Sequence, residues 1–164
     1  MAIRNLRLDG DEILRKKSKP IDVIDDKIKE LANDMLDTMY ASDGIGLAAC
    51  QVGMLKNMVV YDVSYIEEDE IKKPIVLINP KIIQRSKSMV LVEEGCLSFP
   101  NVFFDVKRHE KVKVEFLDLN GEKQVISAKG IEAVVIQHEL DHLEGIIFLD
   151  KVENKNESRK KIQY

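Results

Sequence analysis

Two histidines and a glutamate in the run HELDH are the residues of this sequence best suited to metal chemistry. His138 and His142 are four positions apart, so on a helix they lie on nearly the same face, about 6 Å apart along the axis. Both imidazoles can therefore reach one ion. Glu139 would stand beside that ion, where a general base can take a proton from a bound water. The alternative is a pair of surface histidines on an amphipathic helix, but two of only three histidines fall in this pattern.

A metal site of this kind needs a third protein ligand. Many HExxH proteases use a histidine six residues after the second one, but Phe148 occupies that position here. Others use a downstream glutamate, and the last glutamate of this chain, Glu157, lies in a short polar tail. His109 lies in a charged loop before a hairpin and is interpreted as a surface histidine. Cys96, in EEGCLSFP where a strand is expected to end, is the stronger candidate because a thiolate binds zinc or iron well; otherwise it is a buried free cysteine.

The run GIGLAACQVG is a third feature that can support chemistry. Gly44 and Gly46 permit the backbone to approach a ligand closely because neither carries a Cβ atom. Gln51 follows on a short segment and offers a neutral amide that can donate a hydrogen bond. Taken alone, the run is also typical of a helix end followed by a buried strand of small residues.

Composition and charge exclude several classes of function. The 164 residues fit one domain, and an apolar fraction of 45% suffices for a hydrophobic core. A net charge of −4 argues against a nucleic-acid-binding face, so no DNA partner is expected. Two cysteines cannot form the disulfide framework of a secreted mini-domain, and the first residues lack the apolar stretch of a signal peptide. Since no apolar run is long enough to span a bilayer, we expect a cytoplasmic protein without a membrane partner.

The elements that must position these residues follow from periodicity. An extended arm is expected up to Pro20, and a helix follows it, because Asp25 or Asp26 can cap a run of hydrophobic residues at helical spacing that Gly44 can end. A second helix is expected at about residues 130–144 and carries HELDH. Its apolar stripe contains Ile131, Val134, Val135 and His138.

The middle of the chain has the pattern of strands. NMVVYDV, PIVLINPKI and SMVLVEEG are short, rich in β-branched residues and bounded by turn formers, and residues 64–73 between the first two form an acidic segment expected to be a surface loop. The clearest hairpin joins KVKVEFLD to EKQVISA, since Val112, Val114 and Phe116 alternate with charged residues.

Strands in a block followed by a helix predict an α+β fold, with antiparallel or mixed β-sheets packed around a central metal-binding helix that carries HELDH. No linker or internal repeat interrupts the sequence, so residues 1–164 are expected to form a single catalytic domain. Residues 151–164 are a polar C-terminal tail, expected to be frayed or marginally helical.

Three of these stretches, in this order, resemble the motifs of the peptide deformylase family. The family has G-apolar-G-apolar-A-A-x-Q, E-G-C-apolar-S and H-E-apolar-D-H, and this sequence has GIGLAACQ at 44–51, EGCLS at 94–98 and HELDH at 138–142. The opening arm and the hairpin KVKVEFLDLNGE also look like this family, so the resemblance covers nearly the whole chain. Arg108 matches a second arginine common in the family, whereas Phe103 stands where many members have an arginine at the rim of the substrate site.

The resemblance implies that the enzyme removes the formyl group from N-formylmethionine of nascent polypeptides and releases formate. A metal-activated hydroxide would attack the formyl carbon, with Glu139 as general base and then general acid, while Gln51 and the backbone N–H of Leu97 bind the oxyanion. The implied metal ligands are Cys96, His138 and His142. The implied substrate-binding residues are Ile45, Gly46, Glu94, Ile131, Val134, Val135 and His138.

The resemblance also implies one divalent ion per chain, most commonly Fe(II), with zinc, nickel or cobalt able to replace it. N-formylmethionyl peptides are the implied partners. A further hypothesis is transient contact with ribosomal RNA through the basic tail residues Arg159, Lys160 and Lys161, although a solvated tail explains the same charges.

Three other functions stay open from the residues alone. The first is a different HExxH metallopeptidase, which lacks its usual downstream ligand here. The second is a cysteine hydrolase with Cys96 as the nucleophile, which would keep its activity without metal. The third is a protein with a structural metal or a pure binding role, for which a fourth protein ligand would be expected.

Overall fold

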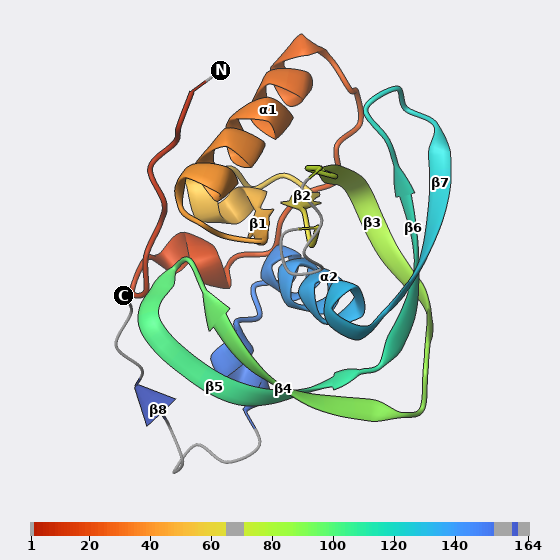
Figure 1. The fold of residues 1–164 in the computed structure, drawn as a ribbon. Helices are drawn as coiled ribbons and strands as arrows, with labels where there is room; N and C mark the ends of the chain where they lie inside the picture. The colour runs from red at the N-terminus through yellow and green to blue at the C-terminus, as the bar shows by residue number, and fades with distance from the viewer. Residues whose placement is uncertain (1, 65–70, 153–158, 161–164) are drawn as a thin grey trace.

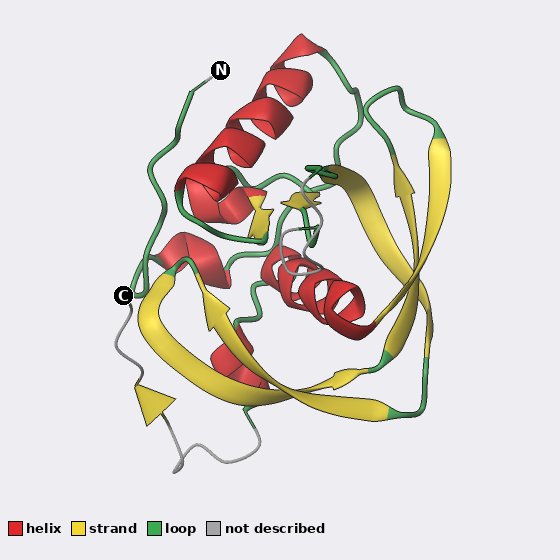
Figure 2. Cartoon of the chain, in the orientation of Figure 1, coloured by secondary structure: helices red, strands yellow, loops and turns green. Residues whose placement is uncertain are grey.

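A computed structural model describes residues 2–64, 71–152 and 159–160 of the chain. In these residues, eight strands form two antiparallel sheets, and two α-helices pack against them (Figures 1 and 2). Helix α2 (Gly130–Leu143) lies in the middle of the molecule, bordered by strands of both sheets (Figure 1). The predicted α+β fold with a central helix carrying HELDH is confirmed, and every strand pair within the sheets is antiparallel.

The five-stranded sheet has the order β1-β2-β3-β6-β7. Its strands are β1 (Gly46–Ala48), β2 (Met58–Tyr61), β3 (Ile75–Arg85), β6 (Lys111–Leu117) and β7 (Lys123–Lys129). β6 and β7 form the predicted hairpin, and Val112, Val114 and Phe116 are buried as their alternation indicated. β1 lies at the edge of this sheet, so among the described residues one side of its backbone has no strand partner.

Helix α1 (Asp26–Ala41) covers one face of this sheet, and α2 covers the other. α1 begins where the side chain of Asp25 accepts the N–H of Ile28, as the capping pattern predicted. In β2, Met58 and Val60 pack into the cluster with α1, while Val59 and Tyr61 pack into the cluster with α2. Both faces of β2 are therefore buried, which explains why its sequence is continuously hydrophobic.

The three-stranded sheet has the order β4-β5-β8, with β4 (Met89–Cys96), β5 (Phe99–His109) and β8 (Arg159–Lys160). β5 corrects the sequence-based interpretation, which expected a turn and then a charged loop before the hairpin. The alternation in FPNVFFDVKRH is weak because its apolar residues are interrupted by charges on both faces. His109, interpreted as a surface histidine in that loop, ends β5 and is half-buried, with Nδ1 at 2.7 Å from the Ser86 carbonyl oxygen.

The ends of the chain also differ in part from the expectation. The arm before Pro20 is mostly irregular but contains a 3₁₀ turn at Glu12–Arg15. In the few tail residues that the structure describes, Lys151 ends another 3₁₀ turn at Phe148–Lys151, Val152 forms a bridge with Val106, and β8 pairs with β5, so these residues are not frayed. Residues 153–158 and 161–164 of the tail, and residues 65–70 of the expected surface loop, lie outside the described residues.

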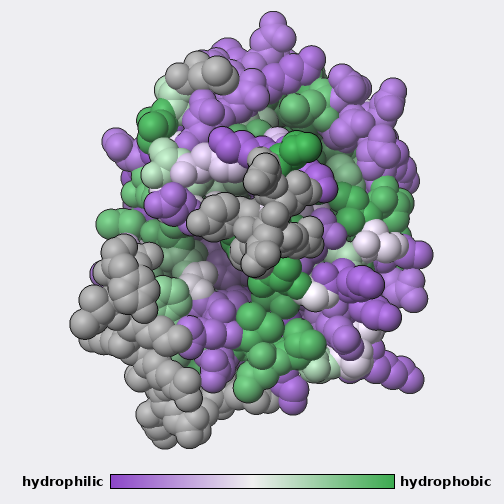
Figure 3. All heavy atoms as spheres, viewed as in Figure 1, coloured by the Kyte–Doolittle hydropathy of each residue, from purple (hydrophilic) through white to green (hydrophobic). Residues whose placement is uncertain are grey.

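Outside the grey residues, hydrophilic side chains cover much of the face shown in Figure 3, in keeping with a chain of 33% charged residues. Hydrophobic side chains gather on this face over the region where β4 and β5 run past each other (Figure 3). Within the described residues, no helix is both long and apolar enough to cross a bilayer.

Candidate metal centre

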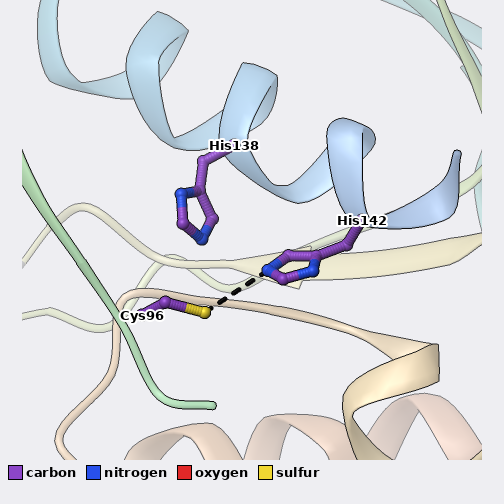
Figure 4. A group of neighbouring side chains, drawn as sticks. All are labelled: Cys96, His138 and His142. Carbon is purple, nitrogen blue, oxygen red and sulfur yellow. Dashed lines mark hydrogen bonds between the residues drawn. The ribbon is translucent and has the colours of Figure 1, made fainter. Parts of the chain in front are cut away.

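The three predicted ligands, Cys96, His138 and His142, come together at the centre of the molecule. Their ligand atoms all lie within 4.8 Å of one another, and Cys96 Sγ lies 3.4 Å from Nε2 of His142 (Figure 4). Both imidazoles project from α2 toward the cysteine, which lies at the end of β4 (Figure 4). Two imidazole nitrogens and one thiolate sulfur at this spacing suit a tetrahedral ion that keeps an open position.

Local structure explains why each ligand is presented in this direction. His138 and His142 are one helical turn apart on α2, so both face the same side of the helix. Cys96 follows a register shift in the β4–β5 ladder, between Glu94 and Cys96, and such an irregularity redirects the side chain at the end of a strand. The two elements are far apart in sequence, and their packing assembles the site.

A buried network of charged side chains, Glu94, Arg108 and Asp141, orients His138. Nδ1 of His138 lies 2.8 Å from Oε1 of Glu94, which leaves Nε2 of the ring to face the other ligands. Arg108 binds both carboxylate oxygens of Glu94, with Nε at 2.7 Å and Nη2 at 2.9 Å, and reaches Asp141 through Nη1 at 2.6 Å. Burial opposes ionisation of Glu94, but the hydrogen bonds from Arg108 and His138 lower its pKa overall. A carboxylate behind a histidine is the usual support of a metal-binding imidazole.

The charges around His138 favour a bound cation, and His142 is poised as a neutral ligand beside it. Burial disfavours protonation of His138, yet contacts with Cys96 and Glu94 raise its pKa well above the ordinary value. Burial, with the neighbouring charges of His138 and Arg108, lowers the pKa of His142 well below the ordinary value, so this ring is a neutral ligand at pH 7. A negative environment that attracts a proton also attracts a divalent ion, and the donor set of two nitrogens and one sulfur therefore fits a metal.

Glu139 lies beside the three ligands but is not one of them. Its Oε1 is 3.8 Å from Nε2 of His138 and 4.0 Å from Nε2 of His142, and its Oε2 has no hydrogen-bond partner within the described residues. Burial raises its pKa to about 7. A Cβ atom on Gly46 would lie 2.8 Å from this Oε2, so the absence of a side chain at that position makes room for the carboxylate. The carboxylate is thus placed and tuned for accepting and returning a proton near neutral pH.

Gln51 reaches the site from the 3₁₀ turn Ala49–Val52 and is fully buried. Its Oε1 accepts the N–H of Ala48 at 2.9 Å, which fixes the orientation of the amide. Its Nε2 therefore points at the metal site, where it donates to Ser98 Oγ at 3.0 Å and lies 3.5 Å from Cys96 Sγ. Ser98, the last residue of the EGCLS run, was not singled out from the sequence.

The second cysteine of the chain is a structural residue. Cys50 is fully buried, and its Sγ donates to the carbonyl of His142 at 3.6 Å. Burial, together with the charges of Glu139 and Cys96, raises its pKa to about 12, so it stays a thiol at neutral pH. Its role is to pack against α2, not to bind the ion.

A cavity of about 550 Å³ opens from the metal site. Cys96, Gln51, His138 and Glu139 lie at its polar end. The predicted substrate-binding residues all line it, namely Ile45, Gly46, Glu94, Ile131, Val134 and Val135, and Leu97 lines it too. The carboxylate of Glu94 is occupied by Arg108 and His138, so its main structural role is to orient the histidine.

Two residues near the site, Phe103 and Asp141, have roles that the sequence did not indicate. Phe103 lines the wall, and a Cβ atom on Gly95 would lie 2.8 Å from its ring, so the ring rests on the backbone next to Cys96. Asp141 completes the network of Arg108, although the sequence offered no signal for it beyond its place inside HELDH. Its role depends on the packing of β5 beside α2, which brings Arg108 to it.

Comparison with known proteins agrees with the geometry. Residues 3–158 match the model of the polypeptide deformylase family. A peptide deformylase from Acetivibrio thermocellus is 51% identical over 152 residues, which cover 93% of this chain and 85% of the relative. One from Finegoldia magna is 49% identical over 157 residues, which cover 96% of this chain and 94% of the relative.

Solved structures give the same result. The crystal structure of peptide deformylase from Thermotoga maritima superposes with a TM-score of 0.88 at 36% identity and covers 94% of this chain and 100% of its own. The structure of a Synechococcus elongatus peptide deformylase in complex with actinonin superposes with a TM-score of 0.88 at 47% identity, covering 93% of this chain and 82% of its own.

Proposed function

Since the chain belongs to the polypeptide deformylase family, we propose that it hydrolyses the formyl group of N-formylmethionine at the amino terminus of nascent polypeptides and releases formate. The observation that carries this proposal is the convergence of Cys96, His138 and His142 beside Glu139 at the end of a largely apolar cavity. The polar end suits amide hydrolysis, and the apolar wall suits a methionine side chain.

In this assignment Cys96, His138 and His142 hold one divalent ion. When bound, the ion lowers the pKa of water and so supplies a hydroxide nucleophile at neutral pH. Fe(II) is the proposed ion on the basis of the family resemblance, and zinc, nickel and cobalt are alternatives that the same ligands accept.

Glu139 moves the proton. With a pKa of about 7, its carboxylate takes a proton from the attacking water and returns it to the nitrogen of methionine as the C–N bond breaks. The unpartnered Oε2 is the atom available for this transfer. An amine is a poor leaving group unless it is protonated, so the return of the proton is as necessary as its removal.

Gln51 Nε2 and the backbone N–H of Leu97 stabilise the negative charge that develops on the formyl oxygen. The amide of Gln51 is held in place by Ala48, so it does not have to reorganise during the reaction. One such donor is typically worth about 3 kcal/mol of transition-state stabilisation.

The peptide enters along the cavity, with the methionine side chain against Ile131, Val134 and Val135. The carbonyl of Ile45 already accepts the N–H of Asp62 at 2.9 Å, so the backbone of Gly46 is the better edge for pairing with the peptide. We propose that residues 1–164 act as a single catalytic domain in the cytoplasm.

Contact of the tail with ribosomal RNA stays a prediction. Arg159 and Lys160 pair through their backbone with β5, and Lys161 lies outside the described residues. Unchanged ribosome binding after removal of residues 153–164 would exclude this contact.

The decisive experiment measures formate release from formyl-Met-Ala-Ser by protein purified without oxygen, together with its metal content. Acetyl-Met-Ala-Ser is the matched control, because an acetyl carbon carries a methyl group where the formyl carbon carries hydrogen. We expect stoichiometric formate and one ion per chain. Cleavage of internal peptide bonds without formate release would favour a metallopeptidase, and full activity after removal of the metal would favour a cysteine hydrolase.

A further inference from the structure

Asp62, a buried carboxylate outside the metal centre, connects several segments around one wall of the cavity. It follows β2 and is 3% exposed. Its carboxylate accepts the hydroxyl of Tyr40 at 2.6 Å, the N–H and hydroxyl of Ser64, and the N–H of Lys73 at 2.9 Å. Its own backbone N–H donates to the carbonyl of Ile45 at 2.9 Å. One residue thus holds four segments together: the end of α1, the chain around Ile45, the end of β2 and the residues just before β3.

The wall concerned is the segment of residues 42–46, called the lip below, and all five of its residues line the cavity. The lip connects the end of α1 to β1. Near its start, the N–H of Gly44 binds the carbonyl of Met39 at 2.9 Å, and near its end Ile45 is held by Asp62. Because Tyr40 binds the carboxylate of Asp62, the two ends of the lip are linked through one side-chain hydrogen bond.

The lip presents a backbone edge to the cavity. In an antiparallel pair, hydrogen-bonded and non-hydrogen-bonded positions alternate along the strand. Ile45 is bonded to Asp62, so its neighbour Gly46, opposite Tyr61, occupies a position whose N–H and C=O point away from β2. These two groups face the side on which β1 has no strand partner. An extended peptide can add there as a further strand.

We propose that Asp62, acting with Tyr40, is a positioning residue for peptide binding: it fixes the lip so that the backbone of Gly46 is set to pair with the formylated peptide. This inference rests on the proposed deformylase function. Burial opposes ionisation of Asp62, but hydrogen bonds from Ser64 and Tyr40 lower its pKa, so the carboxylate accepts from all its donors at neutral pH. Among the described residues, the carboxylate of Asp62 bonds neither to the metal ligands nor to Glu139, so its loss acts on peptide binding rather than on the chemical step.

Two variants of different severity test this role in the metal-loaded enzyme. Tyr40→Phe removes only the hydroxyl that reaches Asp62, and Asp62→Ala removes the whole set of side-chain bonds. With formyl-Met-Ala-Ser, we expect KM to rise about threefold for Tyr40→Phe and about tenfold for Asp62→Ala, since one hydrogen bond contributes on the order of 1 kcal/mol. We expect kcat to stay within about twofold and the metal content to stay unchanged. Amide hydrogen exchange of the lip should become faster in both variants.

Asp34→Asn is the matched control. Asp34 is also a buried carboxylate, 2% exposed, and it accepts from Ala2 and Arg4 without contacting the lip. This variant is expected to lose stability but to keep the parental KM. If Tyr40→Phe and Asp62→Ala fold, bind metal and show the parental KM, or if Asp34→Asn raises KM equally, Asp62 has no positioning role. If the parent enzyme itself releases no formate, the proposed function fails instead.

Discussion

Two parts of the cavity, the metal end and the lip, are built in different ways. At the metal end, side chains on regular elements supply the ligands: His138 and His142 project from α2, and Cys96 ends β4. The buried carboxylate of Glu94 fixes the direction of His138. The lip, residues 42–46, offers mainly backbone, and its position depends on the hydrogen bond that the N–H of Asp62 donates to Ile45 and on those that the carboxylate of Asp62 accepts.

This difference matches what each end must do. A metal ion accepts ligands only within narrow limits of distance and direction, so its side chains need a rigid support. A peptide backbone is the same for every sequence, so a backbone edge can bind many peptides without distinguishing their side chains. Changes at the metal end should therefore abolish chemistry, whereas changes at the lip should weaken binding.

The largest effect is expected for Cys96→Ala. Removal of the thiolate leaves two imidazoles, which hold a divalent ion far more weakly, so the metal should be lost and formate release should fall to background. Elemental analysis beside the formate assay measures both. Cys50→Ala is the control, because the second cysteine packs against α2 and should leave the metal in place. Full metal content in Cys96→Ala would remove this residue from the ligand set.

Glu139→Gln should follow, with the metal retained and kcat reduced about 1,000-fold, since general acid–base catalysis typically contributes a factor of this order. The amide has the same shape as the carboxylate but cannot accept the proton of water. Glu144→Gln, a change at the exposed end of the same helix, should behave as the parent. A normal turnover number for Glu139→Gln would show that another group takes the proton.

Arg108→Met should have an intermediate effect, mainly on the support of the metal end. It leaves Glu94 buried without its cation, which should cost about 3 kcal/mol of folding stability. The loss of orientation at His138 should weaken metal affinity about tenfold or more. Thermal unfolding and metal competition measure the two effects. Lys123→Met removes an exposed ion pair with Glu115 and should change stability by less than about 1 kcal/mol.

The sequence alone predicted features that depend on a few neighbouring residues better than features that depend on contacts between distant segments. The HELDH spacing, the cap at Asp25 and the alternation in β6 are local patterns, and all three predicted structure correctly. The meeting of Cys96 with the histidines had chemical support, but its geometry depends on tertiary packing. β5 was missed because its alternation is weak, and without β5 the partnership of Arg108 with Asp141 could not be inferred.

Asp62 shows the same limit at the lip. Nothing in YDVS distinguishes a carboxylate that caps a loop from one that connects four segments, because its partners Tyr40 and Lys73 are separated from it in sequence. Local patterns therefore predicted the metal end better than the lip, since the lip is defined by hydrogen bonds between distant segments.

The smallest effect on function is expected for Asp34, a buried carboxylate that supports neither the metal site nor the lip. Burial opposes ionisation of Asp34, but hydrogen bonds from Ala2 and Arg4 lower its pKa. A carboxylate whose pKa is depressed in the folded protein contributes stability that is present above its unfolded pKa, 3.8, and is lost as the pH falls through the folded value. Asp34→Asn should therefore lower stability by about 2 kcal/mol at pH 7 and show a flatter decline in acid than the parent. Urea unfolding between pH 7 and pH 3 measures this difference. Metal content and KM should equal those of the parent; a KM raised as much as in Asp62→Ala would mean that loss of any buried carboxylate has this effect and that Asp62 has no positioning role.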